Sequence, residues 1–349
     1  MNPRAGIRTS AAALLATALA ACGASAQGTS GTAAQSPAHR PATIASSPQA
    51  PGIARTPCGP AAAEVLARAA GSVATRIYAG ELSGSETLSD KSQVERFAPL
   101  LAAIASGERG AVNAAVNSLV FSHTHVVRLR VTRGGVVLAD VGGPYILAPV
   151  SGTLRFHGRP VGRYVLSVQD DLGYVKLVTR FIGAPLVLRT GSRTVPVEGV
   201  FAPGPASIPD HGPVSYRNTA YEAFSFNASA FPSGPLRISL LLPLPRSLSA
   251  NTCAEIKSRE LGRVAQRISR RFALAPGNFS AYMEVTRTLT GGLIYIRLGS
   301  RQLAGSTRPS PPRLPSEGSV RYRGVSYEVS SFLARTSVGQ VRIYQLVAP

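Results

Sequence analysis

An internal repeat constrains the fold of this chain more than any other feature of its sequence. Residues 208–243 and 314–349 both follow the pattern [IL]-P-x-x-G-x-V-x-Y-R-x-x-x-Y-E-x-x-S-F-x-A, then G-x-[LV]-R-I and a closing proline. The spacing between matches is constant through the alanine and slips by one residue before the second glycine. Because so many positions match in register, we expect a strand unit that occurs twice.

The repeat divides the chain into two related modules. The first, 58–243, is long, and the second, 244–349, is compact. A duplicated sheet needs the same core twice, so the repeated aromatic residues are interpreted as packing residues and not as ligand contacts. They are Tyr216, Tyr221, Phe226, Tyr322, Tyr327 and Phe332.

Helical and then strand periodicity precedes the first repeat. Apolar residues recur at helical spacing in "CGPAAAEVLARAAGSVATRIY" from residue 58, in "SQVERFAPLLAAIASG" from 92 and in "GAVNAAVNSLVFS" from 110. After residue 124 the period changes to two, and "HVVRLRVTR", "GGVVLADVGG" and "PYILAPV" are predicted strands. A helix with a capping box, Thr252 to Glu255, is predicted to begin the second module.

A hairpin is predicted over residues 161–182, with the strands "VGRYVLSVQ" and "YVKLVTRFI". Two apolar runs are separated by "DDLG", a loop length and composition that favour a type I turn. Asp170 and Asp171 are predicted to lie in this turn, where short acidic side chains accept hydrogen bonds from backbone amides.

The N-terminus predicts export and lipid attachment. Arg4 and Arg8 precede the apolar run "AAALLATALAA", which is too short to span a membrane, so residues 1–21 are interpreted as a signal peptide. The run ends in "LAAC", which resembles the bacterial lipobox and implies lipid attachment at Cys22; an ordinary secretory peptide is the alternative. Residues 22–57 are poor in large apolar groups and are expected to form a disordered tether. We therefore expect a protein anchored by lipid to the extracytoplasmic face of the cell membrane.

The charge of the chain is strongly basic. It carries 37 Lys and Arg against 17 Asp and Glu, a formal net charge of +20. Export argues against nucleic acid and leaves anionic envelope polymers or lipid head groups as candidate partners. A codon bias toward arginine explains the same composition without a polyanion site.

Two cysteines remain after Cys22. In an oxidising compartment an even pair favours a disulfide between Cys58 and Cys253. The alternative makes Cys253 a reactive thiolate at the first turn of a helix.

Catalytic and cofactor motifs are not evident. The sequence contains no G-x-S-x-G, H-E-x-x-H, C-x-x-C or Walker-type loop, so we expect neither an enzyme nor a cofactor. His123 and His125 would share a strand face, but no third metal ligand is evident, so no metal site is predicted.

One stretch of the first module resembles a known family. The helical lead-in followed by "HVVRLRVTRGGVVLADVGGPYILAPVSGTLRFHGRPVGRYVLSVQDD" is similar to a Cache (PDC-type) sensor domain over roughly 60–190. The resemblance implies an α+β fold: a long N-terminal helix and a PAS-like antiparallel sheet, followed here by the smaller related module. It also implies a small-molecule pocket outside the cell. The chain has no Trp, so the aromatic clamp of many amino-acid-binding members is not visible.

A ligand-binding face is predicted on that sheet. Its candidate residues are Arg128, Arg130, Asp140, Tyr145, Asp170, Asp171, Tyr174, Lys176 and Arg180. Basic groups bind an anionic end through charge-assisted hydrogen bonds, and a carboxylate takes an ammonium end. The expected ligand is a small carboxylate or an amino acid, and the alternative is that these charges line a solvated face.

The sequence supports two functions from different classes. The first is a lipid-anchored ligand-binding or sensor-like protein for a small polar molecule. The second is an envelope scaffold whose basic surface binds an anionic polymer or a partner protein.

Overall fold

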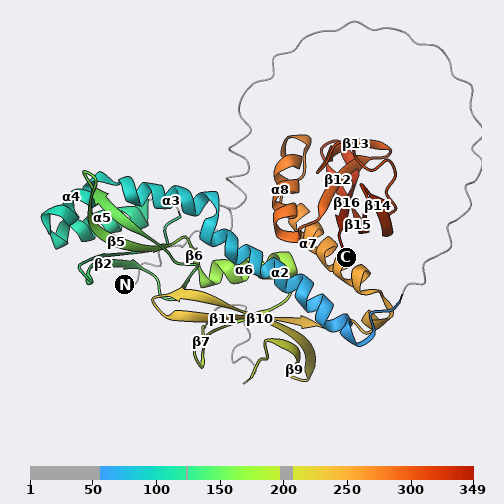
Figure 1. The fold of residues 1–349 in the computed structure, drawn as a ribbon, viewed down its shortest axis with the longest axis horizontal. Helices are drawn as coiled ribbons and strands as arrows, with labels where there is room; N and C mark the ends of the chain where they lie inside the picture. The colour runs from blue at the N-terminus through green and yellow to red at the C-terminus, as the bar shows by residue number, and fades with distance from the viewer. Residues whose placement is uncertain (1–55, 123–124, 197–206) are drawn as a thin grey trace, which may run out of the picture.

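The computed structural model describes residues 56–122, 125–196 and 207–349 (Figure 1). The predicted signal peptide, Cys22, nearly all of the tether and His123 lie outside these residues.

The described part of the chain contains seven α-helices. The helices are α2 (Ala62–Ser83), α3 (Ser85–Arg96), α4 (Ala98–Ser106), α5 (Arg109–Ser122), α6 (Asp171–Ile182), α7 (Cys253–Ser269) and α8 (Phe279–Thr290). Short 3-10 turns precede α2, α7 and α8, namely η2 (Gly59–Ala61), η3 (Leu248–Ala250) and η4 (Pro276–Asn278).

The described strands form three antiparallel sheets. The first has the order β2-β1-β5-β4, with β1 (Arg128–Arg133), β2 (Val136–Gly142), β4 (Val150–Phe156) and β5 (Arg159–Ser167). The second has the order β6-β3-β10-β11-β7-β8 with β9 beside β10, and comprises β3 (Ile146–Leu147), β6 (Gln169–Asp170), β7 (Leu186–Thr190), β8 (Arg193–Thr194), β9 (His211–Tyr216), β10 (Thr219–Phe231) and β11 (Gly234–Pro243). The third has the order β13-β12-β16-β15-β14, with β12 (Leu293–Leu298), β13 (Arg301–Gly305), β14 (Gly318–Tyr322), β15 (Val325–Thr336) and β16 (Gly339–Val347).

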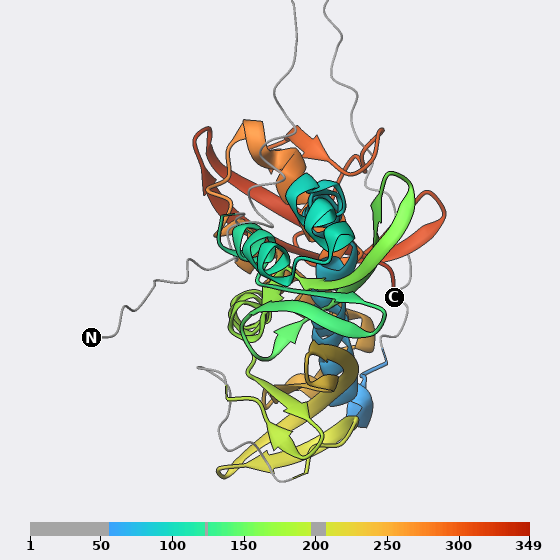
Figure 2. The same cartoon turned by 90° about the vertical axis from the view of Figure 1, so that its left-hand side faces the viewer.

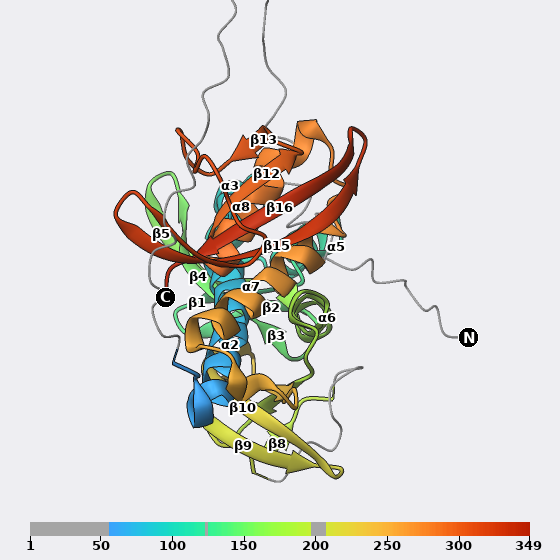
Figure 3. The same cartoon turned by 90° about the vertical axis from the view of Figure 1, so that its right-hand side faces the viewer.

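The expected α+β class, with a long N-terminal helix and a smaller second module, is confirmed. Helices α2 and α7 lie side by side between the second and third sheets (Figures 1 and 3). Helices α4 and α5 cover the first sheet, which has its own core around Ile104, Leu119 and Leu129 (Figure 2). The largest core contains side chains from both sides of residue 244, among them Tyr174 and Val264. The module boundary at 243/244 stays a prediction.

The duplicated strand unit is confirmed. Strands β9, β10 and β11 form one antiparallel meander and β14, β15 and β16 form another. The correspondence extends beyond the repeat, because β11 is followed across the sheet by β7 and β8 just as β16 is followed by β12 and β13. A helix precedes each of these outer pairs, α6 in one case and α8 in the other.

The central helices are also copies of each other. Residues 63–77 of α2 and 254–268 of α7 align without a gap, and eight of the fifteen positions are identical. The identical pairs are Ala63/Ala254, Glu64/Glu255, Arg68/Arg259, Gly71/Gly262, Val73/Val264, Ala74/Ala265, Arg76/Arg267 and Ile77/Ile268. We call α2, α6 and β7–β11 the first unit, and α7, α8 and β12–β16 the second unit.

Equivalent hydrogen bonds occur within the two units. The buried hydroxyl of Tyr174 on α6 donates to the carbonyl of Ala74 over 3.0 Å. Its counterpart on α8, Tyr282, donates to the carbonyl of Ala265 over 3.1 Å. Because each tyrosine joins the same position of its long helix, the two units share their internal packing as well as their strand order.

Reciprocal hydrogen bonds join the two units. Arg76 of α2 donates to the carbonyl of Leu289 at the end of α8 over 2.9 Å. Arg267 of α7 donates to the carbonyl of Ile182 at the end of α6. A contact in which each partner gives the same group to the other is the pattern of a two-fold symmetric interface. The chain is therefore organised as an internal pair of similar units.

The hairpin predicted over residues 161–182 is wrong. Strand β5 ends at Ser167, and the second half of the segment is helix α6. Asp170 caps this helix by accepting a hydrogen bond from the amide of Gly173. Gly183 ends it in the left-handed conformation, at φ 76°. Helix α6 packs on both α7 and α2. Its buried residues follow helical spacing and are Gly173, Tyr174, Val175, Leu177, Val178, Phe181 and Ile182.

Two smaller predictions also need correction. The helix expected from residue 92 is interrupted at Phe97, which has ψ 94°, because it precedes Ala98 and Pro99 at the start of a new helix, α4. The strand expected in "PYILAPV" divides into β3, which joins the second sheet, and β4, which joins the first. The remaining predicted helices and strands of the first module are present.

Candidate functional site

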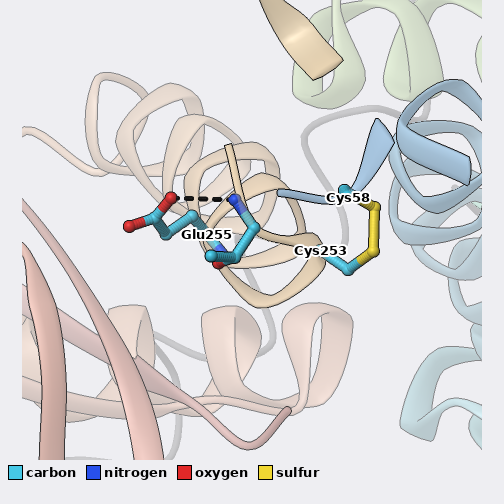
Figure 4. Close-up of a disulfide and its surroundings, with 4 residues drawn as sticks. Cys58, Cys253 and Glu255 are labelled. Atoms are coloured by element: carbon cyan, nitrogen blue, oxygen red, sulfur yellow. Dashed lines mark hydrogen bonds between the residues drawn. A yellow bond between two sulfur atoms is a disulfide. The ribbon is translucent and has the colours of Figure 1, made fainter. Parts of the chain in front are cut away.

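A disulfide joins the beginnings of the two central helices (Figure 4). Cys58 and Cys253 are bonded, with their Cα atoms 4.7 Å apart and a sequence separation of 195. The predicted disulfide is confirmed, and the alternative of a reactive Cys253 is wrong. The predicted capping box is also present, since Thr252 and Glu255 exchange hydrogen bonds at the start of α7.

Three of the predicted ligand residues lie together on the first sheet. Arg130 and Asp140 are register partners on β1 and β2, and Arg128 lies beside them. Asp140 Oδ2 is 2.9 Å from Arg128 and 2.6 Å from Arg130. Burial by itself would raise the pKa of Asp140, but the hydrogen bonds and charges of the two guanidinium groups outweigh it and lower the pKa. The carboxylate is therefore held ionised.

This arginine cluster also contacts the second sheet. The guanidinium carbons of Arg128 and Arg130 lie 5.0 and 4.4 Å from the ring centroid of Phe231 on β10. Arg128 donates in addition to the carbonyl of Gly143. Since these contacts join the two sheets, they give both arginines a structural role. Their role in ligand binding stays a prediction.

The remaining predicted ligand residues do not share one face. Tyr174 is fully buried against α2, whereas Lys176 and Arg180, four residues apart, lie on another side of α6. Asp171 is half-buried in the first turn of α6, and burial followed by the charge of Asp170 raises its pKa. Tyr145, at φ 51°, precedes β3, which pairs with Asp170. The expected convergence of all nine residues depended on the hairpin, and it is absent because this segment is a helix.

A group of buried acids that sequence reasoning did not identify lies where α2 meets α3. Glu81 is 7% exposed and accepts a hydrogen bond from Gln169. Burial raises the pKa of Glu81 to about 7, with a further contribution from the charge of Glu86. Burial, followed by the charge of Asp90, raises the pKa of Glu86 to about 7 as well, and His125 lies within ion-pair distance of it. Among the described residues no group of three or more His, Cys, Asp or Glu is arranged to hold a metal ion.

A polar groove lies between α7 and the strands β14 and β15 of the second unit. It consists of two adjoining hollows of about 260 and 200 Å³. The residues that line them are Glu255, Ser258, Arg259, Gly262, Arg263, Gln266, Glu317, Gly318, Glu328, Val329, Ser330, Ser331 and Phe332. We call this the α7 groove.

Buried polar atoms without partners lie in and beside the α7 groove. Glu328, which is 7% exposed, accepts a hydrogen bond from Ser319 at Oε2, while its Oε1 has no partner among the described residues. Ser330 is the register partner of Gln345, which is fully buried and has no partner for either amide atom in the described chain. Leaving such groups unsatisfied costs about 1–3 kcal/mol each.

In the first unit, apolar side chains stand at the positions of two polar residues of this region. At the positions of Ser330 and Gln345 it has the paired residues Phe224 and Leu240. Phe224 occupies the space that a Cβ atom on Gly71 would need, just as Ser330 does at the equivalent glycine of α7. Two further replacements are polar, Ser258 for Ala67 and Glu317 for His211. The aligned repeats contain this signal, but the helix alignment is needed to interpret it.

Comparison with known proteins gives only distant matches. No protein-family model and no curated protein matches the chain. Among solved structures, the periplasmic domain of Vibrio cholerae LuxQ covers 52% of this chain and 98% of its own length, at 10% identity and a TM-score of 0.31. The ligand-binding domain of Mlp24 with asparagine covers 52% of this chain and 95% of its own, at 10% identity and a TM-score of 0.32. That of the Pseudomonas aeruginosa amino-acid chemoreceptor PctC with GABA covers 48% and 99%, at 14% identity and a TM-score of 0.25.

These matches are to a periplasmic domain and to two ligand-binding domains. Likeness at this level carries no statement about the ligand or the role of this chain. Within the described residues, no helix combines the length and the apolar character needed to cross a membrane.

Proposed function

We propose that this protein is a lipid-anchored, extracytoplasmic binding protein for a small polar molecule, which it binds without chemical change. The observation that supports the proposal most directly is the α7 groove, a polar hollow at the position where the first unit has an apolar contact. The groove lies on the second unit and not on the face predicted from the sequence.

The groove combines space with unused hydrogen-bonding capacity. Its hollows of about 260 and 200 Å³ are each smaller than the usual ligand pocket of roughly 300–1,000 Å³, so they suit only a small molecule. Buried polar groups in folded proteins are nearly always paired. A ligand that donates a hydrogen bond to Oε1 of Glu328 would recover the cost of burying this oxygen without a partner.

Binding without chemistry agrees with the residues present. The lining residues supply carboxylates, guanidinium groups and hydroxyl groups, and they include neither histidine nor cysteine. A hydroxyl nucleophile needs an adjacent base, but the Ser258 hydroxyl donates to the carbonyl of Glu328 and the Ser330 hydroxyl donates to the carbonyl of Ser258. Both hydroxyl groups are thus committed to backbone acceptors.

The disulfide supports an extracytoplasmic location, because such bonds persist in oxidising compartments. Lipid attachment is tested by Cys22→Ser. The variant should leave the membrane fraction and appear in detergent-free extract, whereas a variant that partitions like the wild type contradicts the anchor.

Ligand binding is tested by a thermal-shift screen of the exported protein against small metabolites. The double variant Ser330→Phe, Gln345→Leu gives the groove the residues of the first unit. We expect a concentration-dependent rise in melting temperature for the wild type and none for the double variant. A wild type that responds to no compound, or a double variant that responds equally, contradicts the proposed site.

A scaffold that binds an anionic envelope polymer is the second candidate. It is favoured by Arg155, Arg159 and Arg163, which are exposed on the hairpin of β4 and β5, and by the formal charge of +20. Salt-sensitive binding to polyanions, together with no response in the metabolite screen, would support the scaffold.

A further inference from the structure

We infer that the ligand of the α7 groove is a small organic cation that carries a primary ammonium group. This inference rests on the proposed function and adds the charge and the functional group of the ligand. It is carried by the groove's excess of carboxylates and by the unpartnered oxygen of Glu328.

The larger hollow of the α7 groove is acidic in a basic protein. The larger hollow is lined by three carboxylates, Glu255, Glu317 and Glu328, and by one guanidinium, that of Arg259. The formal charge of the whole chain is +20. Arg263, which lines the smaller hollow, pairs with Glu260 at 3.2 Å. The carboxylates of the larger hollow therefore keep a local excess that opposes the overall charge, and this hollow favours a cation.

Glu328 supplies the buried acceptor. Ser319 Oγ donates to its Oε2 over 2.7 Å, which fixes the carboxylate, and Oε1 receives no hydrogen bond from the described residues. An ammonium group has three donors and no acceptor, so it can bond this oxygen and keeps two donors for other acceptors in the hollow. A hydrogen bond between two charged groups is stronger than one between neutral groups.

Arg259 is already engaged at the mouth of the groove. Its guanidinium donates to the side chain of Asn251 over 2.6 Å and lies 3.4 Å from Glu317. The exposed fractions of Arg259 and Glu317 are 44% and 63%, so water screens this ion pair. Arg259 therefore competes only weakly with a bound cation for the carboxylate of Glu317.

The first unit lacks the same excess of carboxylates. There Glu64 pairs with Arg68 at 2.6 Å, and His211 stands at the position of Glu317. The equivalent of Glu328 is Glu222. Burial, followed by the charge of Glu64, raises the pKa of Glu222, and the charge of His211 offsets part of this rise. Glu222 is thus a matched control, a carboxylate at the same strand position without the groove.

The experiment measures binding of putrescine and ethanolamine by calorimetry, with ethylene glycol and succinate as neutral and anionic comparisons. We expect the exported wild-type protein to bind the two amines and neither comparison compound. Glu328→Gln keeps the shape of the side chain and removes its charge, so it should weaken binding of the amines at least tenfold. Glu317→Gln, at an exposed position that tolerates change, should weaken it less, and Glu222→Gln should leave it unchanged.

The outcomes separate this inference from the proposed function. If the Glu328→Gln and Glu317→Gln variants bind the amines as strongly as the wild type does, the inference is overturned. A neutral or anionic compound that binds the wild type and is lost in the Ser330→Phe, Gln345→Leu variant also overturns it, while the proposed function stands. If none of the four compounds binds, the inference is overturned, and the metabolite screen then decides whether the proposed function also fails.

Discussion

The two units have the same framework and differ in the side chains between the long helix and the sheet. In the first unit Phe224 and Leu240 fill that space, and in the second Ser330 and Gln345 leave it polar and partly open. Both helices keep a glycine at the point of closest approach. The comparison shows that the same framework holds either an apolar contact between helix and sheet or a candidate site. The residues at two paired strand positions make the difference.

The units also differ in the segment that comes after the long helix. Helix α2 continues to Ser83 and leads into the helices and strands of the first sheet, whereas α7 ends at Ser269. The extension of α2 carries Glu81, one of the two acids whose pKa is raised to about 7. The extension of α2 therefore gives the first unit a titratable acid, Glu81, that has no counterpart in the described part of the second unit.

The largest expected effect concerns the disulfide that joins the two units. Replacing both Cys58 and Cys253 with Ser opens a loop of 195 residues, for which loop entropy gives a loss of about 5 kcal/mol in the free energy of unfolding. Urea denaturation measures the loss, and reduction of the wild type should reproduce it. If neither changes the transition, the packing of α2 on α7 alone holds the units together.

An exchange of residues between the units tests the comparison directly. Phe224→Ser with Leu240→Gln should destabilise the protein by about 4 kcal/mol, because it removes apolar packing and buries an amide. The reverse exchange, Ser330→Phe with Gln345→Leu, should be neutral or stabilising, since it removes an unpaired buried amide. Similar losses in both variants would show that the two spaces are not equivalent.

The dependence of stability on pH tests the raised pKa of Glu81. The pKa of Glu81 in the folded protein is about 7, against 4.5 for the ordinary carboxyl, so the folded state binds more protons between these values. Stability therefore falls as pH rises through this window, by about 3 kcal/mol for Glu81. Denaturation at pH 4.5 and pH 8 should show a smaller difference for Glu81→Gln than for the wild type. A variant with the same pH dependence as the wild type would contradict the assignment.

The smallest effect tests the equivalence of the tyrosines. Tyr174→Phe and Tyr282→Phe each remove one buried hydrogen bond to the long helix, and each should cost about 1 kcal/mol. The expected result is two nearly equal losses in urea denaturation. If one loss exceeds the other several-fold, the helices α6 and α8 do not pack equivalently.

The sequence by itself determined the features that depend on local pattern. The repeated strand unit, the helix from residue 62 and the strands β1, β2 and β5 follow from periodicity, which records the buried face of each element. The pairing of Cys58 with Cys253 followed from the number of cysteines and the predicted compartment. The repeat also contained the polar replacements at Ser330 and Gln345.

Only the tertiary structure decided the features in which several elements meet. Residues 174–182 carry apolar side chains that fit a strand or a helix, and burial against α2 together with the caps at Asp170 and Gly183 selects the helix. Arg128 and Arg130 have the charges of ligand contacts, but Asp140 and Phe231 engage them across two sheets. The α7 groove exists because a helix crosses a strand that is 70 residues away at the Ser258–Glu328 contact. A local pattern specifies which face of an element is apolar, but the partner that covers that face is chosen by packing over long distances in the chain.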